Sequence, residues 1–420
     1  MNNNDIVNNR IKSGEPLFKT KSKCCGCGSC SFVCPVNAIT MKEDRLGFIY
    51  PSVDNKKCVG CKKCIQVCSL NKPNKRITKK CYAGINLNDE QRNKSTSAGI
   101  FSAVSTAFIN NGDFVSGAVM DINQGQAQVY HKLINKDQYL SELQGSKYVQ
   151  SNFWNAYPDI IQALRQGKNV LISGTPCQIS SVISVFDKYR KQIFTIDLVC
   201  HGVPNIKMFN SYLDNFQKSE NIQLKSFCFR DKDKGWGHSK SSYTTNDSLA
   251  SNKKFLSNYS YYYFFMQSEI ARPSCYSCPY ACPDRVGDIT IGDYWGVEQY
   301  SPEILKENGG SFDKKSGISC ILVNTEKGNE LLSMAKDSLE LAEIDFSKVM
   351  IRNTQLRQPA RHTKIRDKVF SLYLNKGYDG VEKYYRRLVL KRKVVTKLKR
   401  VTPRRIVGYI NRKLKIGIYN

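Results

Sequence analysis

The sequence predicts three parts in chain order: a small cysteine-rich α+β module, an α/β domain with a largely parallel sheet, and a basic, helical C-terminal tail. Three observations lead to this division. Cysteines crowd the first part of the 420-residue chain. Apolar segments that alternate between strand and helix character begin at residue 81. Lys and Arg then dominate the end of the chain, so the expected boundaries are 15–75, 81–350 and 361–420.

Eight cysteines of the first part follow a doubled Cys-x2-Cys-x2-Cys-x3-Cys pattern. The two runs are Cys24, Cys27, Cys30, Cys34 and Cys58, Cys61, Cys64, Cys68. Such spacing holds two [4Fe-4S] clusters, and the fourth cysteine of each run ligates the cluster of the other run. The pattern predicts a ferredoxin-like module with cluster one on Cys24, Cys27, Cys30 and Cys68, and cluster two on Cys58, Cys61, Cys64 and Cys34. A disulfide framework or zinc knuckles fit the repeated spacing poorly.

The remaining elements are expected from hydrophobic periodicity. Residues 38–41 and 48–50 predict a small hairpin between the two cysteine runs, and 71–80 predict a linker. In the second part, strands are expected at 81–85, 114–120, 129–133, 169–173 and 193–199, and helices at 97–108, 157–165 and 176–186. After residues 228–230 the chain is polar through about residue 254 and is expected to be rich in loops. The aromatic run 259–265 is expected in the core.

Composition and charge favour a soluble protein in a reducing compartment. The N-terminus shows no signal-peptide pattern, and no 18 apolar residues follow one another, so we expect a cytoplasmic protein. The net charge is +28. Residues 361–420 hold 19 Lys and Arg against three Asp and Glu, a net +16, so the rest is only mildly basic. We therefore expect no nucleic-acid partner.

The tail has the composition of a basic amphipathic helix over residues 384–417. Its cations alternate with apolar side chains such as Leu388, Val389 and Val395. A helix of this kind binds an anionic membrane surface, with each cation near the surface adding about 1 kcal/mol. The chain would then sit peripherally at the inner face of the membrane. The alternative is a solvated helix or a disordered tail.

Four short motifs follow one another in the second part. They are SGTPCQ (173–178), VCHGVP (199–204), RPSCYSC (272–278) and DITIGDYWG (288–296). Their order, with the cysteine module ahead of them, resembles the coenzyme F-420 hydrogenase/dehydrogenase β-subunit family. The resemblance implies a flavoprotein with iron–sulfur clusters. Such a protein passes electrons between its clusters and FAD, and to or from an organic hydride acceptor.

Two of these motifs place a cysteine just after a predicted strand. A parallel sheet brings Cys177 and Cys200 to the same edge, where open α/β sheets bind ligands. With Cys275 and Cys278 they supply four thiolates, the number that a third cubane requires. Cys282 is a spare that replaces one of them in an alternative assignment. In another alternative, Cys177 and Cys200 are buried apolar residues, and Cys275, Cys278 and Cys282 form a zinc site.

The flavin site is less visible in the sequence. There is no Gly-x-Gly-x-x-Gly fingerprint at a strand–helix junction. The resemblance points instead to hydroxyl, amide, lysine and glycine residues at helix starts and turns, namely Ser97, Gly99, Lys147, Gly174, Thr175 and Gln178. Lys147 would pair with a phosphate of FAD. Hydroxyls at helix starts are most often plain N-caps, and Ala98 stands where relatives would carry glycine.

Other polar residues are weaker candidates. His201 follows Cys200 and either tunes a cluster through a hydrogen bond or is a structural part of its turn. His131 and His238 have no evident partner in the sequence. Asp288 and Asp293 flank a strand and are either proton sources or turn formers.

The favoured function is an iron–sulfur flavoprotein oxidoreductase. Its clusters would accept single electrons from a donor protein and pass them to FAD, which reduces an organic two-electron acceptor. Bacterial members that the chain resembles suggest a role in envelope-polysaccharide assembly. The alternatives are a flavin-free, ferredoxin-like electron-transfer or adaptor subunit that serves a partner enzyme, and a redox-sensing regulator.

Overall fold

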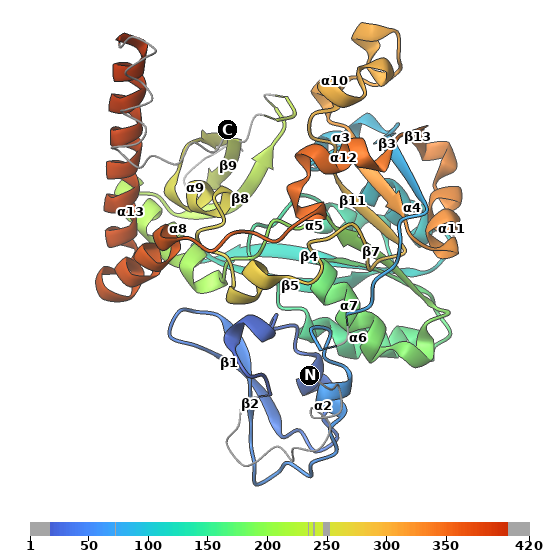
Figure 1. Cartoon of the computed structure of the whole chain (residues 1–420). Coiled ribbons are helices and arrows are strands. Elements are labelled where there is room, and N and C mark those ends of the chain that lie inside the picture. The colour runs from blue at the N-terminus through green and yellow to red at the C-terminus, as the bar shows by residue number, and fades with distance from the viewer. Residues whose placement is uncertain (1–16, 72, 234, 238–239, 247–252, 402–420) are drawn as a thin grey trace, which may run out of the picture.

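The computed structural model describes residues 17–71, 73–233, 235–237, 240–246 and 253–401. Figure 1 shows a small N-terminal module against a larger body with one wide sheet, and the long helix α13 (Lys364–Val401) along one side. Residues 15–16 of the expected module and 402–420 of the expected tail lie outside the described residues. In the described part of the chain, no helix is both long and apolar enough to cross a membrane.

The N-terminal module repeats one local structure, as its doubled cysteine pattern predicts. Gly26 and Gly60 stand at equivalent places, just before Cys27 and Cys61, and have φ of +69° and +70°. Both turns use a left-handed backbone that glycine adopts readily. The module contains two short helices and the expected hairpin, which are α1 (Ser29–Phe32), α2 (Lys63–Gln66), β1 (Ile39–Glu43) and β2 (Ile49–Val53).

The body is built on an eight-stranded sheet with the order β13-β3-β12-β11-β7-β6-β4-β5. Its strands are β3 (Lys80–Asn86), β4 (Phe114–Asn123), β5 (Gln126–Ile134), β6 (Val170–Gly174), β7 (Ile193–Leu198), β11 (Ile289–Asp293), β12 (Ser319–Val323) and β13 (Leu339–Glu343). The pairs β4–β6, β6–β7 and β7–β11 are parallel, and the flanking pairs are antiparallel. The expected parallel sheet is confirmed at the centre and wrong at the edges.

The edge strand β5 shows why the sequence pattern misleads there. It returns beside β4 through a tight turn in which Gln124 and Gly125 have φ of +50° and +77°. Two consecutive left-handed residues form the turn that closes a two-residue hairpin. Such a turn joins only antiparallel neighbours, because parallel strands need a long crossover.

Helices cover both faces of the main sheet, since successive side chains of a strand point to opposite faces. Leu171 packs against α4 (Ile100–Asn110) and α11 (Glu326–Met334) on one face. Its neighbours Val170 and Ile172 pack on the other face against helices α6 (Tyr157–Arg165) and α7 (Pro176–Val185). Shorter helices of the body are α3 (Asp89–Lys94), α5 (Leu140–Leu143), α10 (Val297–Tyr300) and α12 (Phe346–Arg352).

A second sheet corrects the expectation of loops after residue 230 and through about residue 254. Strands β8 (Leu224–Asp231), β9 (Lys240–Thr245) and β10 (Lys254–Leu256) pair antiparallel. The polar residues of β9 do not show the alternating pattern of a strand. Their side chains can be buried because they form hydrogen bonds inside the fold. Ser241 donates a hydrogen bond to the Phe229 carbonyl, and Ser242 donates one to Asp231.

The aromatic run lies in the core, as expected, and forms α9 (Ser260–Met266) beside α8 (Ile206–Glu220). The start of the expected tail joins the same core. Phe370 and Tyr385 of α13 are buried there, and Leu388 and Val389 pack against it. α13 is kinked at Gly377, and the predicted helix of residues 384–417 is confirmed from 384 to Val401, the part that the structure describes.

Candidate iron–sulfur centres

The predicted ligands of cluster one, Cys24, Cys27, Cys30 and Cys68, lie together although Cys68 belongs to the second run. Burial raises the pKa of Cys24 to about 11, the Arg272 guanidinium opposes this shift, and the charges of Cys27 and Cys68 add to it. Burial also raises the pKa of Cys30, with further contributions from Cys27, Cys24 and Cys68. Thiols that crowd in this way lose their protons when iron binds. Their donor chemistry fits a cubane.

The predicted ligands of cluster two lie at the other end of the module. Cys34, Cys58, Cys61 and Cys64 line one pocket, walled by apolar side chains such as Ile39, Val53 and Val59. The Ala38 N–H donates a hydrogen bond to the Cys34 sulfur at 3.2 Å. Hydrogen bonds of this kind stabilise a thiolate. The crossed pairing of the two runs therefore agrees with the arrangement of the thiols in space.

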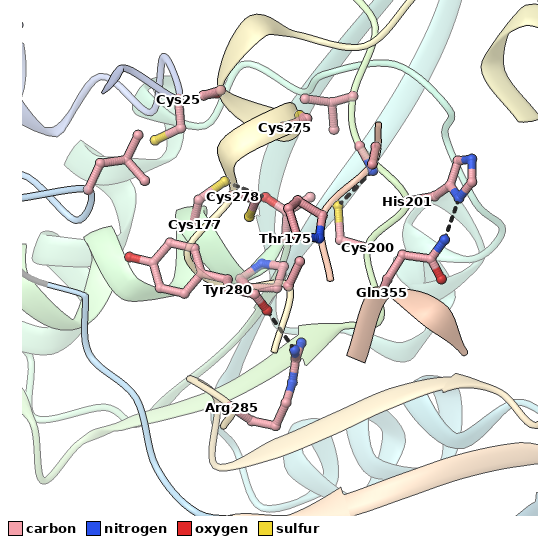
Figure 2. Close-up of a pocket in the computed structure, with 18 residues that line it drawn as sticks. Cys25, Thr175, Cys177, Cys200, His201, Cys275, Cys278, Tyr280, Arg285 and Gln355 are labelled. Atoms are coloured by element: carbon pink, nitrogen blue, oxygen red, sulfur yellow. Dashed lines mark hydrogen bonds between the residues drawn. The ribbon is translucent and has the colours of Figure 1, made fainter. Parts of the chain in front are cut away.

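A third set of thiols lines a pocket of the body, which we call the cysteine pocket. It contains the four predicted ligands Cys177, Cys200, Cys275 and Cys278, which surround one space in Figure 2. The empty space is about 610 Å³ out to its open mouth. β6 and β7 pair in parallel with Gly174 opposite Asp197, so the turns that follow them meet at one edge. Cys177 then begins α7, and Cys200 follows β7.

The two alternative assignments of these cysteines both involve Cys282. Cys282 is not among the residues that line the cysteine pocket, and its thiol donates to the carbonyls of Pro279 and Asp284 at 3.4 Å each. Among the described residues, no three His, Cys, Asp or Glu side chains converge on the position of one metal ion. A cubane instead presents four separate irons, so its ligands surround an open volume.

Cys25 also lines the cysteine pocket, and sequence reasoning missed it. Its side chain is only 7% exposed. The neighbouring Cys177 thiol raises the pKa of Cys25 well above the usual range, and the Cys27 thiol acts in the opposite direction. Cys25 thus lies between a predicted cluster-one ligand and a predicted pocket ligand. The signal in the sequence was a cysteine directly after Cys24 that the doubled pattern leaves unused.

A buried arginine ties the inner end of the module to the body. Arg272 is fully buried and donates hydrogen bonds to the carbonyls of Cys24 at 2.8 Å and Ile49 at 2.7 Å. Its guanidinium also lies 4.3 Å from the centre of the Tyr50 ring. A Cβ at Gly28 would come within 2.5 Å of Trp154 of the body. The end of the module that would hold cluster one is therefore packed tightly against the body.

Buried charges hold the strand ends beneath the cysteine pocket. Arg285 lines the pocket and forms an ion pair with Asp197 at 2.5 Å, both essentially inaccessible to solvent. Asp197 also accepts hydrogen bonds from Thr290 and from the Gly287 N–H. Removing one member of such a pair leaves a buried charge without a partner, which costs several kcal/mol. This pair fixes β7 and β11 where Cys200 leaves the sheet.

Comparison with known proteins identifies both parts of the chain. Residues 167–348 match the family model for the C terminus of the beta subunit of coenzyme F420 hydrogenase/dehydrogenase. Residues 167–348 are therefore a domain of this family. Residues 23–71 match the 4Fe-4S dicluster domain, so the N-terminal module is an iron–sulfur domain. In this chain, the β-subunit domain therefore follows an iron–sulfur domain, an arrangement associated with oxidoreductases.

One similar solved structure is a chain of the xenon-derivatised F420-reducing [NiFe] hydrogenase complex from Methanosarcina barkeri. The sequence identity is 16% and the TM-score 0.44, over 72% of this chain and 94% of that chain. No curated protein matches the sequence.

The two candidate aspartates have structural partners. Asp288 is fully buried, pairs with Arg190 at 2.6 Å, and accepts hydrogen bonds from the N–H and hydroxyl of Thr195. Asp293 pairs with Arg230 at 2.6 Å and accepts a hydrogen bond from the Trp236 ring. These contacts indicate that both carboxylates stabilise the fold.

The histidines also occupy structural positions. His201 lines the cysteine pocket, is hydrogen-bonded to Gln355 at 2.8 Å, and has its pKa lowered by burial. Burial lowers the pKa of His131 to about 4, and its ring bonds to the Ser173 carbonyl. His238 lies outside the described residues.

Three of the predicted flavin residues lie around a joined pair of loops. The Ser146 N–H donates to the Thr96 hydroxyl at 2.7 Å, which brings the loops of Ser97 and Lys147 together. Gly99 is the left-handed N-cap of α4. Lys147 donates to the carbonyls of residues 142 and 144, and burial lowers its pKa to about 7.

The other predicted flavin residues belong to the turn that enters α7. Thr175 and Gln178 form a capping box at its start, so these side chains stabilise the helix. Thr175 also lines the cysteine pocket, and Gly174 is the last residue of β6. A cation that the sequence did not single out lies closer to the first group: Lys232 donates to the Ser97 carbonyl at 2.7 Å. The predicted set therefore divides between two places.

Proposed function

We propose that this chain is an iron–sulfur flavoprotein oxidoreductase. It takes single electrons from a donor protein, conducts them through cluster two, cluster one and a third cluster in the cysteine pocket, and delivers them to FAD and an organic acceptor. FAD, when bound, exchanges single electrons with clusters and electron pairs with organic molecules. The matched iron–sulfur domain supports the first half of this route.

The observation that carries the proposal is the row of thiols Cys27, Cys25 and Cys177. Cys25 lines the cysteine pocket beside Cys177, and its pKa is shifted by both Cys177 and Cys27, so it is close to both thiols. Ligands of cluster one and of the cysteine pocket are thus separated by a single side chain. Because electron tunnelling slows steeply with distance, adjacent centres of this kind form an efficient pair. The contact gives the module a direct connection to the body.

The cysteine pocket has the chemistry that a cubane needs. Cys177 begins α7, where helix N–H groups favour a thiolate. The Cys200 sulfur accepts the Gly202 N–H at 3.4 Å. Burial raises the pKa of Cys278 to about 11, and the Arg285 guanidinium opposes that shift. Iron and nearby cations would together offset the thiolate charge. We assign Cys177, Cys200, Cys275 and Cys278 as ligands of the third cluster.

For FAD we propose the joined loops that contain Ser97, Gly99 and Lys147, together with the backbone of the Gly174–Gln178 turn. A Cβ at Gly145 would meet no described atom within 4 Å, so this turn borders open space. The Lys147 ammonium would leave its two carbonyl partners to pair with a phosphate. The side chains of Thr175 and Gln178 are already engaged in the capping box. These residues would therefore bind FAD through their backbone N–H groups.

The test is anaerobic reconstitution of the full chain with iron, sulfide and FAD. Three cubanes predict about twelve irons per chain, and the protein should retain about one FAD after gel filtration. Lys147→Met should weaken FAD binding without changing the iron content. In a single-turnover experiment, adding FAD to the reduced clusters should bleach the flavin absorbance. A protein that holds its irons but does not bind FAD contradicts the flavoprotein proposal.

The second candidate function is a flavin-free electron-transfer subunit. It is favoured by one observation: Lys147, Thr175 and Gln178 already have internal hydrogen-bond partners. Such a subunit would pass cluster electrons to a partner enzyme. Twelve irons without retained FAD is the outcome that supports this function over the first.

We also propose that α13 brings this cytoplasmic chain to an anionic membrane surface, in a setting such as bacterial polysaccharide assembly. Leu388 and Val389 pack on the body, which leaves Leu390 and Val394, 63% and 50% exposed, as the apolar contacts. The side chain of Val395 lies outside the described part. Leu390→Ser with Val394→Ser should reduce sedimentation with anionic vesicles at low salt. Unchanged sedimentation would contradict this role.

A further inference from the structure

The outer end of the N-terminal module exposes the surroundings of cluster two. Cys61 is solvent-exposed, and the neighbouring Val59 is 65% exposed. A Cβ at Gly60 would meet no described atom within 4 Å. Val36, which also lines the cluster-two pocket, is 36% exposed. This thiol set therefore lies at the surface of the module, beside two exposed valines.

Basic residues surround this apolar centre. Residues 54–64 contain four lysines and one acidic residue, Asp54. Lys56, Lys57 and Lys63 are exposed, and Lys57 lies 3.9 Å from Asp54. We call the set Val36, Lys56, Lys57, Val59, Lys62 and Lys63 the cluster-two face. Its charge favours an acidic partner, and its exposed valines supply apolar area that a partner protein would bury.

The inner end of the module has the opposite character. There, Arg272 and Trp154 of the body pack against the turns that carry Cys24 and Gly28. Figure 1 shows the module packed against the body, whereas Val59 and Cys61 of the turn before α2 are exposed. An external protein therefore approaches the redox centres of the module most closely through cluster two.

We propose that the cluster-two face docks a small acidic protein that carries single electrons, such as an acidic ferredoxin. This deepens the proposed function and rests on it, because the face matters only if cluster two is present. The step is a one-electron transfer in which the reduced carrier is oxidised and the oxidised cluster is reduced, and no bond forms or breaks. Lipid or nucleic acid shares the negative charge but exchanges no electrons, so the redox centre inside the basic ring favours a carrier protein.

The test uses the reconstituted full chain and a chemically reduced acidic [2Fe-2S] ferredoxin, mixed anaerobically in a stopped-flow instrument. The variant is Lys56→Glu/Lys57→Glu/Lys63→Glu. Lys62 is left unchanged because it has φ of +60° at the start of α2. The matched control reverses three exposed lysines of the body, Lys136→Glu/Lys218→Glu/Lys225→Glu. Methyl viologen radical, a small cationic reductant, measures cluster reduction without protein docking.

At low ionic strength the second-order rate of cluster reduction should fall at least about tenfold in the variant and stay near wild type in the control. Added salt should slow the wild type and leave the variant nearly unchanged. Iron content and the extent of reduction by viologen should be equal in all three proteins.

Equal ferredoxin rates in three fully loaded proteins would overturn the docking proposal alone. So would a variant that loses binding to anionic vesicles while its ferredoxin rate is unchanged. A wild type that binds no iron in the module would overturn the proposed function as well.

Discussion

The N-terminal module gathers its eight predicted ligands from residues 24–68, whereas the cysteine pocket gathers its thiols from places between residues 25 and 278. In the module, tight turns position neighbouring thiols with little help from the rest of the chain. In the pocket, the thiols meet only because β6 and β7 end at the same edge and residues 273–278 cross it. The pocket should therefore depend on the whole body, and the module mainly on its own turns.

The largest expected effect that tests this difference comes from Arg285→Ala. It leaves Asp197 charged and unpaired in the interior, which should lower the free energy of unfolding of the body by about 3–5 kcal/mol. The urea midpoint followed by circular dichroism measures the change. Iron of the pocket should be lost while about eight irons stay in the module. The exposed control Arg165→Ala should change stability by less than about 0.5 kcal/mol. Similar midpoints for the two variants would contradict the assigned role of the ion pair.

The next largest effect is a pH dependence of the free energy of unfolding, which we expect to arise in the body. The pKa of His131 is lowered from 6.5 to about 4 by burial, so the unfolded chain takes up a proton in this window and the folded chain does not. The free energy of unfolding should therefore fall by up to about 3 kcal/mol as pH decreases from 6.5 towards 4. His131→Gln should flatten part of this slope in thermal unfolding between pH 7 and 5. An unchanged slope would contradict the buried neutral ring.

A smaller effect compares the two ends of the module through equivalent glycines. Gly26→Ala and Gly60→Ala both place alanine at φ near +70°, which costs about 1–2 kcal/mol in each. Only Gly26 is crowded, since its Cβ would lie 2.8 Å from Arg272 and from the Ile49 carbonyl. Gly26→Ala should lose roughly a further 1–3 kcal/mol and open the 71–80 segment to proteolysis. Equal melting temperatures and cleavage rates would show that the inner contact is weak.

The sequence allowed most of the body to be predicted, because its central strands are apolar runs and its helices have apolar faces. β9 was missed since its serines satisfy their hydrogen bonds inside the fold, a fact that polarity alone hides. The predicted ligand sets of the module could be inferred because the spacing of the cysteines in the sequence alone indicates them.

Cys25 and Lys232 could not be inferred, because their roles arise from contacts between distant segments. Cys25 acquires its place only when the module packs on α7. Lys232 follows β8 yet reaches carbonyls of residues 97 and 316. Long-range packing of this kind leaves no local signal.

Iron content and electron paramagnetic resonance show directly whether the cysteine pocket holds a third cluster. Cys200→Ser should retain about eight of twelve irons, because a hydroxyl is a poor iron ligand. Cys282→Ser, a cysteine just outside the pocket, should retain about twelve. The reduced Cys200→Ser protein should also lose one spectral component. A Cys200→Ser protein with wild-type iron and an unchanged spectrum would contradict the account.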